Sequence, residues 1–180
     1  MKKRIVLIVF FLYFFNHATF SQDLSNLDMK FGFNKFKLES SYEMYKSKLT
    51  PRLTSSGKIL KGYDGVKYYD YTGEDIKLVF GAFVKIVNLG FFNNKLYTIS
   101  VEFIATSDED ENRIKEGLKD LFGYQPISSD SKYDWALSWE TDKTYLQVCK
   151  HSCLYKYDPC RVEMFLFSKK LRAEVNNNQF

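Results

Sequence analysis

The chain has 180 residues, of which 45% are hydrophobic and 18% are aromatic, and its formal net charge is +4. This length and composition predict one globular domain that buries a core without help from disulfides or metals. The basic residues are scattered singly, whereas a surface that binds phosphates groups them, so nucleic acid is excluded as a partner.

The N-terminus has the pattern of a secretory signal peptide over 1–21. Basic residues at the start precede an apolar run of eleven residues over 5–15. A membrane-spanning helix needs about 20 such residues, and the small residues Thr19 and Ser21 suit a cleavage site. We therefore expect cleavage near Ser21/Gln22, export to the periplasm or the exterior, and no permanent membrane span afterwards. Three of the 26 basic residues and none of the 22 acidic residues lie in this leader, which leaves a net charge of +1.

The rest of the chain is predicted to form a polar lead-in over 22–35, a single domain over 36–172 and a flexible polar tail over 173–180. The first elements of the domain follow from a capping pattern. Ser40-Ser41-Tyr42-Glu43 has the form of a capping box, and Pro51 disfavours helical backbone at the residue before it. These features predict a short helix over 41–49 and, after it, a loop over 52–65 that is rich in Gly, Ser and Thr.

Strands follow in the first half of the domain. Asn93-Asn94 predicts a two-residue hairpin turn, because Asn tolerates positive φ. The partner strand alternates, with Thr98, Ser100 and Glu102 on one face. The opposite face of this strand is predicted to carry Tyr97, Ile99, Val101 and Phe103. Two earlier strands are also predicted, one over 66–71 and one over 76–92, and the second should bend or bulge near Gly81 or Gly90.

The second half begins with a helix over 107–122. Ser107 precedes four acidic residues, which suit the start of a helix. Gly123 suits its end. The buried stripe is predicted to contain Ile114, Leu118, Leu121 and Phe122, and strands are predicted over 133–139, 144–150 and 160–167.

This order predicts an α+β fold with antiparallel sheet and two helices. The halves 36–104 and 107–168 each have a helix and strands, which indicates a degenerate duplication of one unit. The architecture resembles that of small exported modules such as β-lactamase-inhibitor proteins and outer-membrane assembly lipoproteins. The resemblance implies a module that binds proteins, although a fold alone does not specify a function.

The three cysteines of the chain lie within the segment 149–160. An exported chain meets an oxidising compartment, which favours a disulfide over free thiols. If the apolar residues at 146 and 148 face the core, Cys149 points to the opposite face, so a bridge between Cys153 and Cys160 is the first prediction. A bridge between Cys149 and Cys160 is the second possibility.

Metal sites have weaker support from the spacing. Three thiolates and His151 could bind zinc, but Cys-x-His-x-Cys differs from the usual two to four residues between paired ligands. Asp108, Asp110 and Asn112 resemble the opening of an EF-hand calcium loop. That loop requires Gly at the position of Arg113, and helix capping accounts for the acids, so no metal and no cofactor is predicted.

Catalytic signatures are absent from the sequence, so no catalytic residue is predicted. His151 is the only imidazole beyond the leader, and its neighbour Ser152 points away from it in an extended chain. The chain contains no HExxH helix, no nucleophile elbow and no Gly-rich phosphate loop. A hydrolase that uses paired carboxylates is a third possible function, after binding of a protein and binding of a small ligand or carbohydrate.

Aromatic residues on the predicted strands have two interpretations. Tyr69, Tyr71, Trp135 and Trp139 could form an exposed platform that binds protein or sugar. The other interpretation is that they fill the core and form cross-strand pairs, as aromatic residues usually do.

The predicted function follows from export and from the missing catalytic signatures. We expect a non-catalytic protein that binds another protein of the envelope or exterior. The second possibility is a module that binds a small ligand or carbohydrate through Tyr and Trp side chains.

Overall fold

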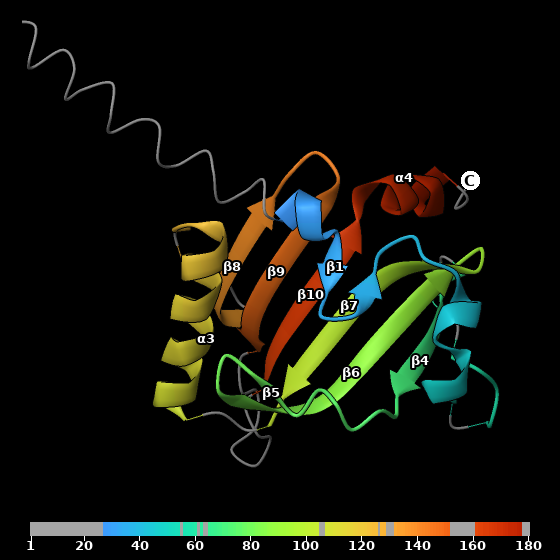
Figure 1. Cartoon of the computed structure of the whole chain (residues 1–180), viewed down its shortest axis with the longest axis horizontal. Helices are drawn as coiled ribbons and strands as arrows, with labels where there is room; N and C mark the ends of the chain where they lie inside the picture. The colour runs from blue at the N-terminus through green and yellow to red at the C-terminus, as the bar shows by residue number, and fades with distance from the viewer. Residues whose placement is uncertain are drawn as a thin grey trace, which may run out of the picture.

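The computed structural model describes residues 27–54, 56–60, 62, 65–104, 107–125, 127–128, 132–151 and 161–177. The expected signal peptide, Cys153 and Cys160 lie outside the described residues. In chain order the named elements are β1 Gly32–Phe33, β2 Phe36–Lys37, the 3-10 helices η1 Tyr42–Met44 and η2 Lys46–Lys48, β3 Leu49–Pro51, β4 Lys67–Tyr71, β5 Leu78–Val79, β6 Ala82–Phe92, β7 Lys95–Phe103, α3 Asp108–Phe122, β8 Tyr133–Glu140, β9 Thr144–His151, β10 Val162–Ser168 and α4 Lys169–Asn177 (Figure 1).

A single antiparallel sheet forms the centre of the molecule and confirms the α+β class. Its strand order is β3-β4-β6-β7-β10-β9-β8, and β5 pairs with β6 outside this path. The chain leaves the sheet after β7, passes through α3 and returns at the far edge as β8, so that β10 comes back to pair with β7. Both halves of the domain thus build one sheet. In the part of 36–104 that the structure describes, the helical elements are the 3-10 helices η1 and η2.

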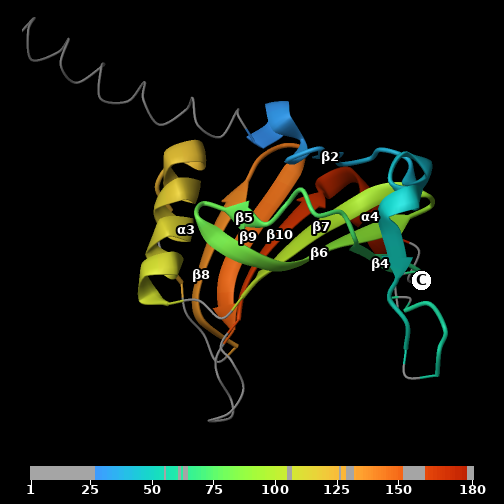
Figure 2. The same ribbon diagram turned by 60° about the horizontal axis from the view of Figure 1, so that its bottom comes forward.

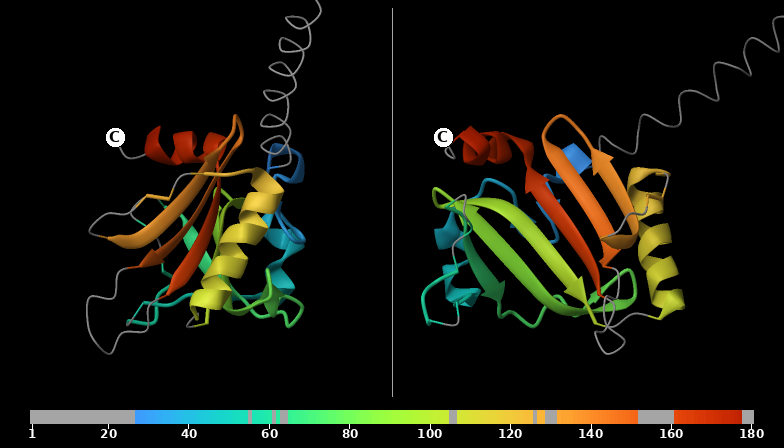
Figure 3. Two further views of the ribbon diagram at one scale, coloured as in Figure 1. Left: turned by 90° about the vertical axis from the view of Figure 1, so that its left-hand side faces the viewer. Right: turned by 180° about the vertical axis from the view of Figure 1, so that it is seen from behind.

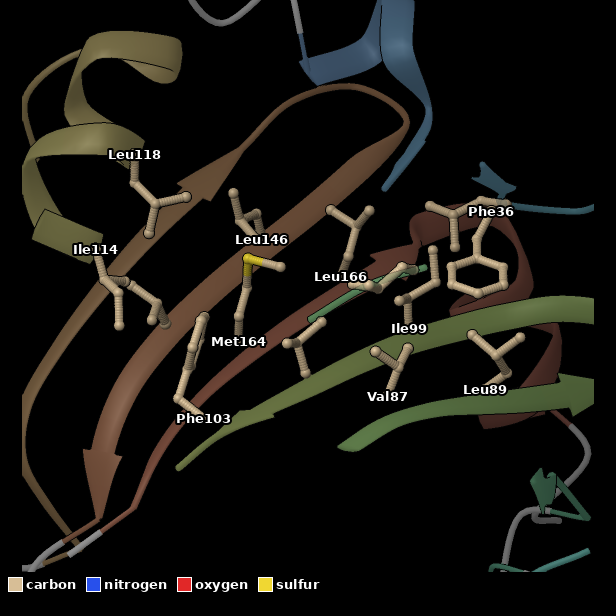
Figure 4. Packing of buried hydrophobic residues seen from close by; sticks show 14 of the residues in the cluster. Phe36, Val87, Leu89, Ile99, Phe103, Ile114, Leu118, Leu146, Met164 and Leu166 are labelled. Carbon is tan, nitrogen blue, oxygen red and sulfur yellow. The ribbon is translucent and has the colours of Figure 1, made fainter. Parts of the chain in front are cut away.

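Helix α3 covers one face of the sheet beside β8 and β9 (Figure 1). Its predicted start is confirmed by a capping box, in which Ser107 Oγ accepts from Asp110 N and the Asp110 carboxylate accepts from Ser107 N, both at 3.2 Å. Three residues of its predicted stripe, Ile114, Leu118 and Phe122, are buried as expected, whereas the fourth, Leu121, is only half-buried. Figure 4 shows Ile114 and Leu118 facing the apolar side chains of the strands.

The folded part of the chain includes residues of the expected lead-in. A helical turn over 27–30 and the β1–β2 hairpin lie against the same sheet face as α3 (Figure 1). Leu27 and Phe36 are each only 1% exposed and belong to the main core. Packing of the core therefore begins before residue 36.

The predicted helix over 41–49 is wrong. Ser41 does cap a helical turn, accepting from Glu43 N at 3.3 Å, but only the two 3-10 helices form. Leu49 and Pro51 instead pair with β4 as strand β3. Nine residues are marginal for an α-helix without strong tertiary support. The last of these nine, Leu49, pairs with β4 in the sheet instead.

The expected single strand over 76–92 is a tight hairpin of β5 and β6. Phe80 and Gly81 form its turn, with φ of 52° and 76°. The bend near Gly81 is thus a complete reversal, while irregular pairing occurs between Gly90 and Phe91. The predicted turn at Asn93-Asn94 is confirmed, because both residues have positive φ.

Tyr97 does not share the core face of Ile99, which corrects the predicted alternation of β7. Gly90 pairs with Thr98 and Phe91 pairs with Leu96, so Tyr97 is the extra residue of a bulge. The bulge turns its side chain into a second, smaller cluster.

Helix α4 covers that second cluster and corrects the prediction of a flexible tail for residues 173–177, while residues 178–180 lie outside the described part of the chain. The helix extends to Asn177, and Leu171 and Val175 are buried at helical spacing. They pack with Val66, Phe92 and Tyr97. Figure 3 shows α4 and α3 on opposite faces of the sheet.

Candidate functional site

A polar cluster lies on the outer face of the sheet, opposite the main core. Cys149 and His151 are two residues apart on β9, and Glu163 of β10 is paired directly with Cys149. His151 Nε2 lies 2.6 Å from Glu163 Oε2 and 3.9 Å from Cys149 Sγ. The side chain of Tyr133 packs edge-on against the imidazole, with 5.2 Å between ring centroids. The cluster thus combines the thiol, imidazole and carboxylate groups that nucleophilic catalysis uses.

The geometry of this cluster does not suit nucleophilic catalysis. A catalytic dyad or triad needs one imidazole nitrogen for the nucleophile and the other for the carboxylate, but here Nε2 contacts both groups. Burial, together with the nearby charge of Glu163, raises the pKa of the Cys149 thiol to about 12. The thiolate is the reactive form, so this thiol is a poor nucleophile at neutral pH.

Two carboxylates also meet on this face. Glu163 of β10 is paired with Glu102 of β7, and like charges opposite each other destabilise a sheet. Each is neutralised by a separate cation. Lys85 Nζ lies 2.6 Å from Glu102 Oε1, and Arg161 Nε lies 3.7 Å from Glu163 Oε2. Both carboxylates therefore take part in ion pairs, which accounts for their presence without acid–base chemistry.

The cysteine predictions are only partly reached by the described residues. Cys149 is a free thiol and fully buried. It points away from the main core, as predicted, while Leu146 and Val148 lie in that core. Cys153 and Cys160 lie outside the described residues, so the predicted bridge between them stays a prediction.

The two predicted binding tyrosines are core residues. Tyr69 and Tyr71 are 7% and 8% exposed. Tyr69 packs edge-on against Phe91, and Tyr71 packs edge-on against Phe36. Tyr71 Oη also donates to Asp75 Oδ1 at 2.7 Å. These rings have no face left for a ligand.

The two predicted binding tryptophans are buried as well. Trp135 Nε1 donates to Glu111 Oε2 at 2.9 Å, and Trp139 Nε1 donates to the carbonyl of Gly123 at 3.0 Å. Alternate residues of β8 face the core, and both tryptophans occupy such positions. The interpretation as a carbohydrate platform is therefore replaced by the interpretation as core.

The acids at the start of α3 serve the helix. Asp110 bonds to Ser107 and to the guanidinium of Arg113. These partners lower the pKa of Asp110, with the Arg113 hydrogen bond as the largest cause. Among the described residues, no group of three or more His, Cys, Asp or Glu side chains could hold a metal ion.

An exposed apolar row crosses the end of the sheet. Leu78 of β5 is paired with Phe83 of β6, and Ile104 N donates to the carbonyl of Phe83 at 3.0 Å. The exposed fractions of these residues are 55%, 64% and 50%. Side chains that are directly opposite on neighbouring strands share a face. We refer to Leu78, Phe83 and Ile104 as the apolar row.

An apolar cleft with a volume of about 260 Å³ lies between α3, the β1–β2 hairpin, β5 and the inner face of the sheet. Figure 2 shows β5 and the turn after it beside α3. Sequence reasoning missed this cleft and the apolar row. The one local signal was the bend expected near Gly81, which is the hairpin that borders both. The residues that line the cleft are Leu27, Lys30, Gly32, Phe33, Asn34, Leu78, Val79, Phe80, Leu118, Leu121, Phe122, Leu146, Met164 and Leu166.

Comparisons with known proteins do not place the chain in a family. No protein-family model, no curated protein and no solved structure matches it. No helix within the described parts of the chain is long and apolar enough to span a membrane.

Proposed function

We propose that this chain is a non-catalytic binding protein and that its partner is another protein, which contacts the apolar row. The observation that carries the proposal is the exposure of three large apolar side chains side by side across three chain segments. Water contact with such a surface is unfavourable, and contiguous exposed apolar residues in a folded protein are typical of interaction surfaces.

The location of the row supports a protein partner. Strand β5 is only two residues long, and among the strands of the described residues it pairs with β6, so its second edge makes no strand pair there. A strand edge without a strand partner, next to apolar side chains, is the combination that strand addition by a partner uses. The polar cluster around Glu163 offers no comparable reason to propose catalysis.

The location in the cell is proposed on the leader alone. With a signal peptide over 1–21, the protein is exported to the periplasm or exterior, and its partner is a protein of the envelope or exterior. A duplication of the halves 36–104 and 107–168 is likewise proposed only on the order of their elements.

The test is site-specific photocrosslinking in the cells that make the protein. A photoreactive phenylalanine analogue replaces Phe83, which keeps an aromatic ring at that position. The matched control carries the analogue at Met44, which is 68% exposed on η1. We expect a discrete adduct with one protein from Phe83 and none from Met44, and we expect the recovered chain to begin at Gln22.

A second variant tests the apolar contact directly. Phe83→Ser, combined with an analogue at Ile104, removes the largest apolar side chain of the row and should abolish the adduct from Ile104. Adducts of equal yield from Phe83 and Met44 would contradict the proposed surface. A chain that retains Met1 would contradict export by cleavage.

A further inference from the structure

The apolar cleft has a buried floor and an exposed rim, as a ligand site requires. Leu146, Met164 and Leu166 form the floor on β9 and β10, and each is at most 3% exposed. Leu118 of α3 also lines the cleft, and Figure 4 shows it on the side of Leu146 and Met164 that α3 covers. At the rim, Lys30 is exposed. A ligand can therefore enter from solvent and bury its apolar part.

The size of the cleft sets the size of the ligand. An engineered apolar cavity of about 150 Å³ holds one benzene molecule, with six carbon atoms. By the same measure, a cleft of about 260 Å³ has room for about ten carbon atoms. This is the size of a medium-length alkyl chain and is too small for a two-chain phospholipid.

The charge at the rim of the cleft indicates which polar group a bound ligand would carry. Lys30 is the one charged residue among those that line the cleft, and it makes no ion pair with the described residues. Asn34 lies at the same rim and can donate a hydrogen bond. We propose that the cleft binds a single-chain amphiphile of about ten carbon atoms with an anionic head group, whose chain lies on Met164 and whose head contacts Lys30.

The β5–β6 hairpin forms one wall of the cleft, through Leu78, Val79 and Phe80. Phe80 has a φ of 52°, a backbone conformation that is unfavourable for a bulky side chain. Its ring lies against Gly117 of α3, where a Cβ would come within 2.2 Å of Phe80 Cδ1. The ring is thus held by its fit against a glycine on the helix. Among the described strands, β5 pairs with β6, so this wall is joined to the sheet through one strand pair.

The binding test uses decanoate as the probe, at concentrations below those at which it forms micelles, with titration calorimetry on the full mature chain. Each methylene is worth about fourfold in affinity, so octanoate, which is two methylenes shorter, should bind about fifteenfold more weakly than decanoate. Decanol has the same chain without the charge. Lys30→Gln should weaken binding of decanoate about threefold and leave decanol unchanged, whereas Lys58→Gln, at an exposed lysine in the 52–65 loop, should change neither.

A filled-cleft variant tests the location. Leu121→Trp places a larger side chain in the cleft and should weaken decanoate binding at least tenfold. The matched control is Leu53→Trp, because Leu53 is 59% exposed and lies in the 52–65 loop. Circular dichroism and the unfolding midpoint establish that both variants fold.

A second measurement covers the case in which Leu121→Trp does not fold. With ¹³C-labelled methionine methyl groups in the wild-type chain, decanoate should shift the resonance of Met164 and leave that of Met44 unchanged. Absence of binding, or binding that leaves the Met164 resonance unchanged, would overturn the proposal. Equal effects of Lys30→Gln on decanoate and decanol would overturn the anionic head group.

Discussion

At the scale of single residues, a buried ion pair joins α3 to the sheet. Glu111 is only 4% exposed. Its carboxylate lies 2.7 Å from Lys150 Nζ and accepts from the indole of Trp135. The hydrogen bond to Glu111 is the largest cause that raises the pKa of Lys150. A carboxylate can be buried here because Oε2 accepts from the indole and Oε1 lies against the ammonium group of Lys150.

Glu111→Gln removes the charge and leaves Lys150 without its counterion. We expect the free energy of unfolding to fall by about 2 kcal/mol, less than for a fully buried pair because Lys150 keeps some contact with water. Urea unfolding measures the change. The matched control is Glu116→Gln on the same helix, whose exposed pair with Lys119 should contribute less than about 0.5 kcal/mol. An equal loss in both variants would contradict the role of Glu111.

At the scale of elements, each helix is held by what it covers. Helix α3 has its own capping box and a buried stripe, so the start of the helix and its buried face both follow from residues of the helix itself. Helix α4 is shorter and lacks acidic residues in its first turn. It depends on Leu171 and Val175, which pack on the second cluster across the outer face of the sheet.

Leu171→Ala should therefore destabilise the protein through a cavity beneath α4. Leu171 is fully buried, and such truncations cost about 2–5 kcal/mol, so we expect a loss of about 3 kcal/mol in the free energy of unfolding. Asn176→Ala, at an exposed position on the same helix, is the control and should leave stability within about 0.5 kcal/mol. If both variants unfolded at the wild-type urea concentration, α4 would not be part of the cooperative fold.

At the scale of the whole molecule, the sheet joins the two halves through β7 and β10. This pairing places Glu102 opposite Glu163 and encloses Cys149 on the outer face. Burial of that thiol has a consequence for global stability. Its pKa rises from 9.0 to about 12 in the folded protein, so the unfolded chain loses this proton first. The buried neutral thiol therefore contributes to the free energy of unfolding, and this contribution is fully present below pH 9 and is lost as the pH rises toward 12.

The pH dependence of unfolding checks this effect. Between pH 8 and pH 10, the thiol should reduce the free energy of unfolding by about 1.4 kcal/mol. Tyrosines and lysines also titrate in this range, so the measured quantity is the difference between wild type and Cys149→Ala at each pH. A difference that stays constant from pH 8 to pH 10 would show that Cys149 does not titrate as a buried thiol.

Elements that depend on neighbouring residues were predictable from the order of amino acids. Ser107 and Asp110 cap α3 across three residues, and Asn93-Asn94 turns the chain because Asn tolerates positive φ. The alternation of β9 likewise fits the assumption that Leu146 and Val148 face the core, which the structure bears out. In each case the decisive interaction lies within one helical turn, one hairpin or one strand. Such local interactions can be predicted from the pattern of neighbouring residues in the sequence.

Features that depend on distant residues required the tertiary structure. The strand β3 forms because β4 is beside it, and Tyr97 changes face because Phe91 pairs with Leu96 across a bulge. The apolar cleft exists because α3, β5 and the β1–β2 hairpin converge from separate parts of the chain, with the Phe80 ring against Gly117. Local patterns identify which residues are apolar, but only the packing of remote elements decides which of them are covered and which are left to bind a partner or a ligand.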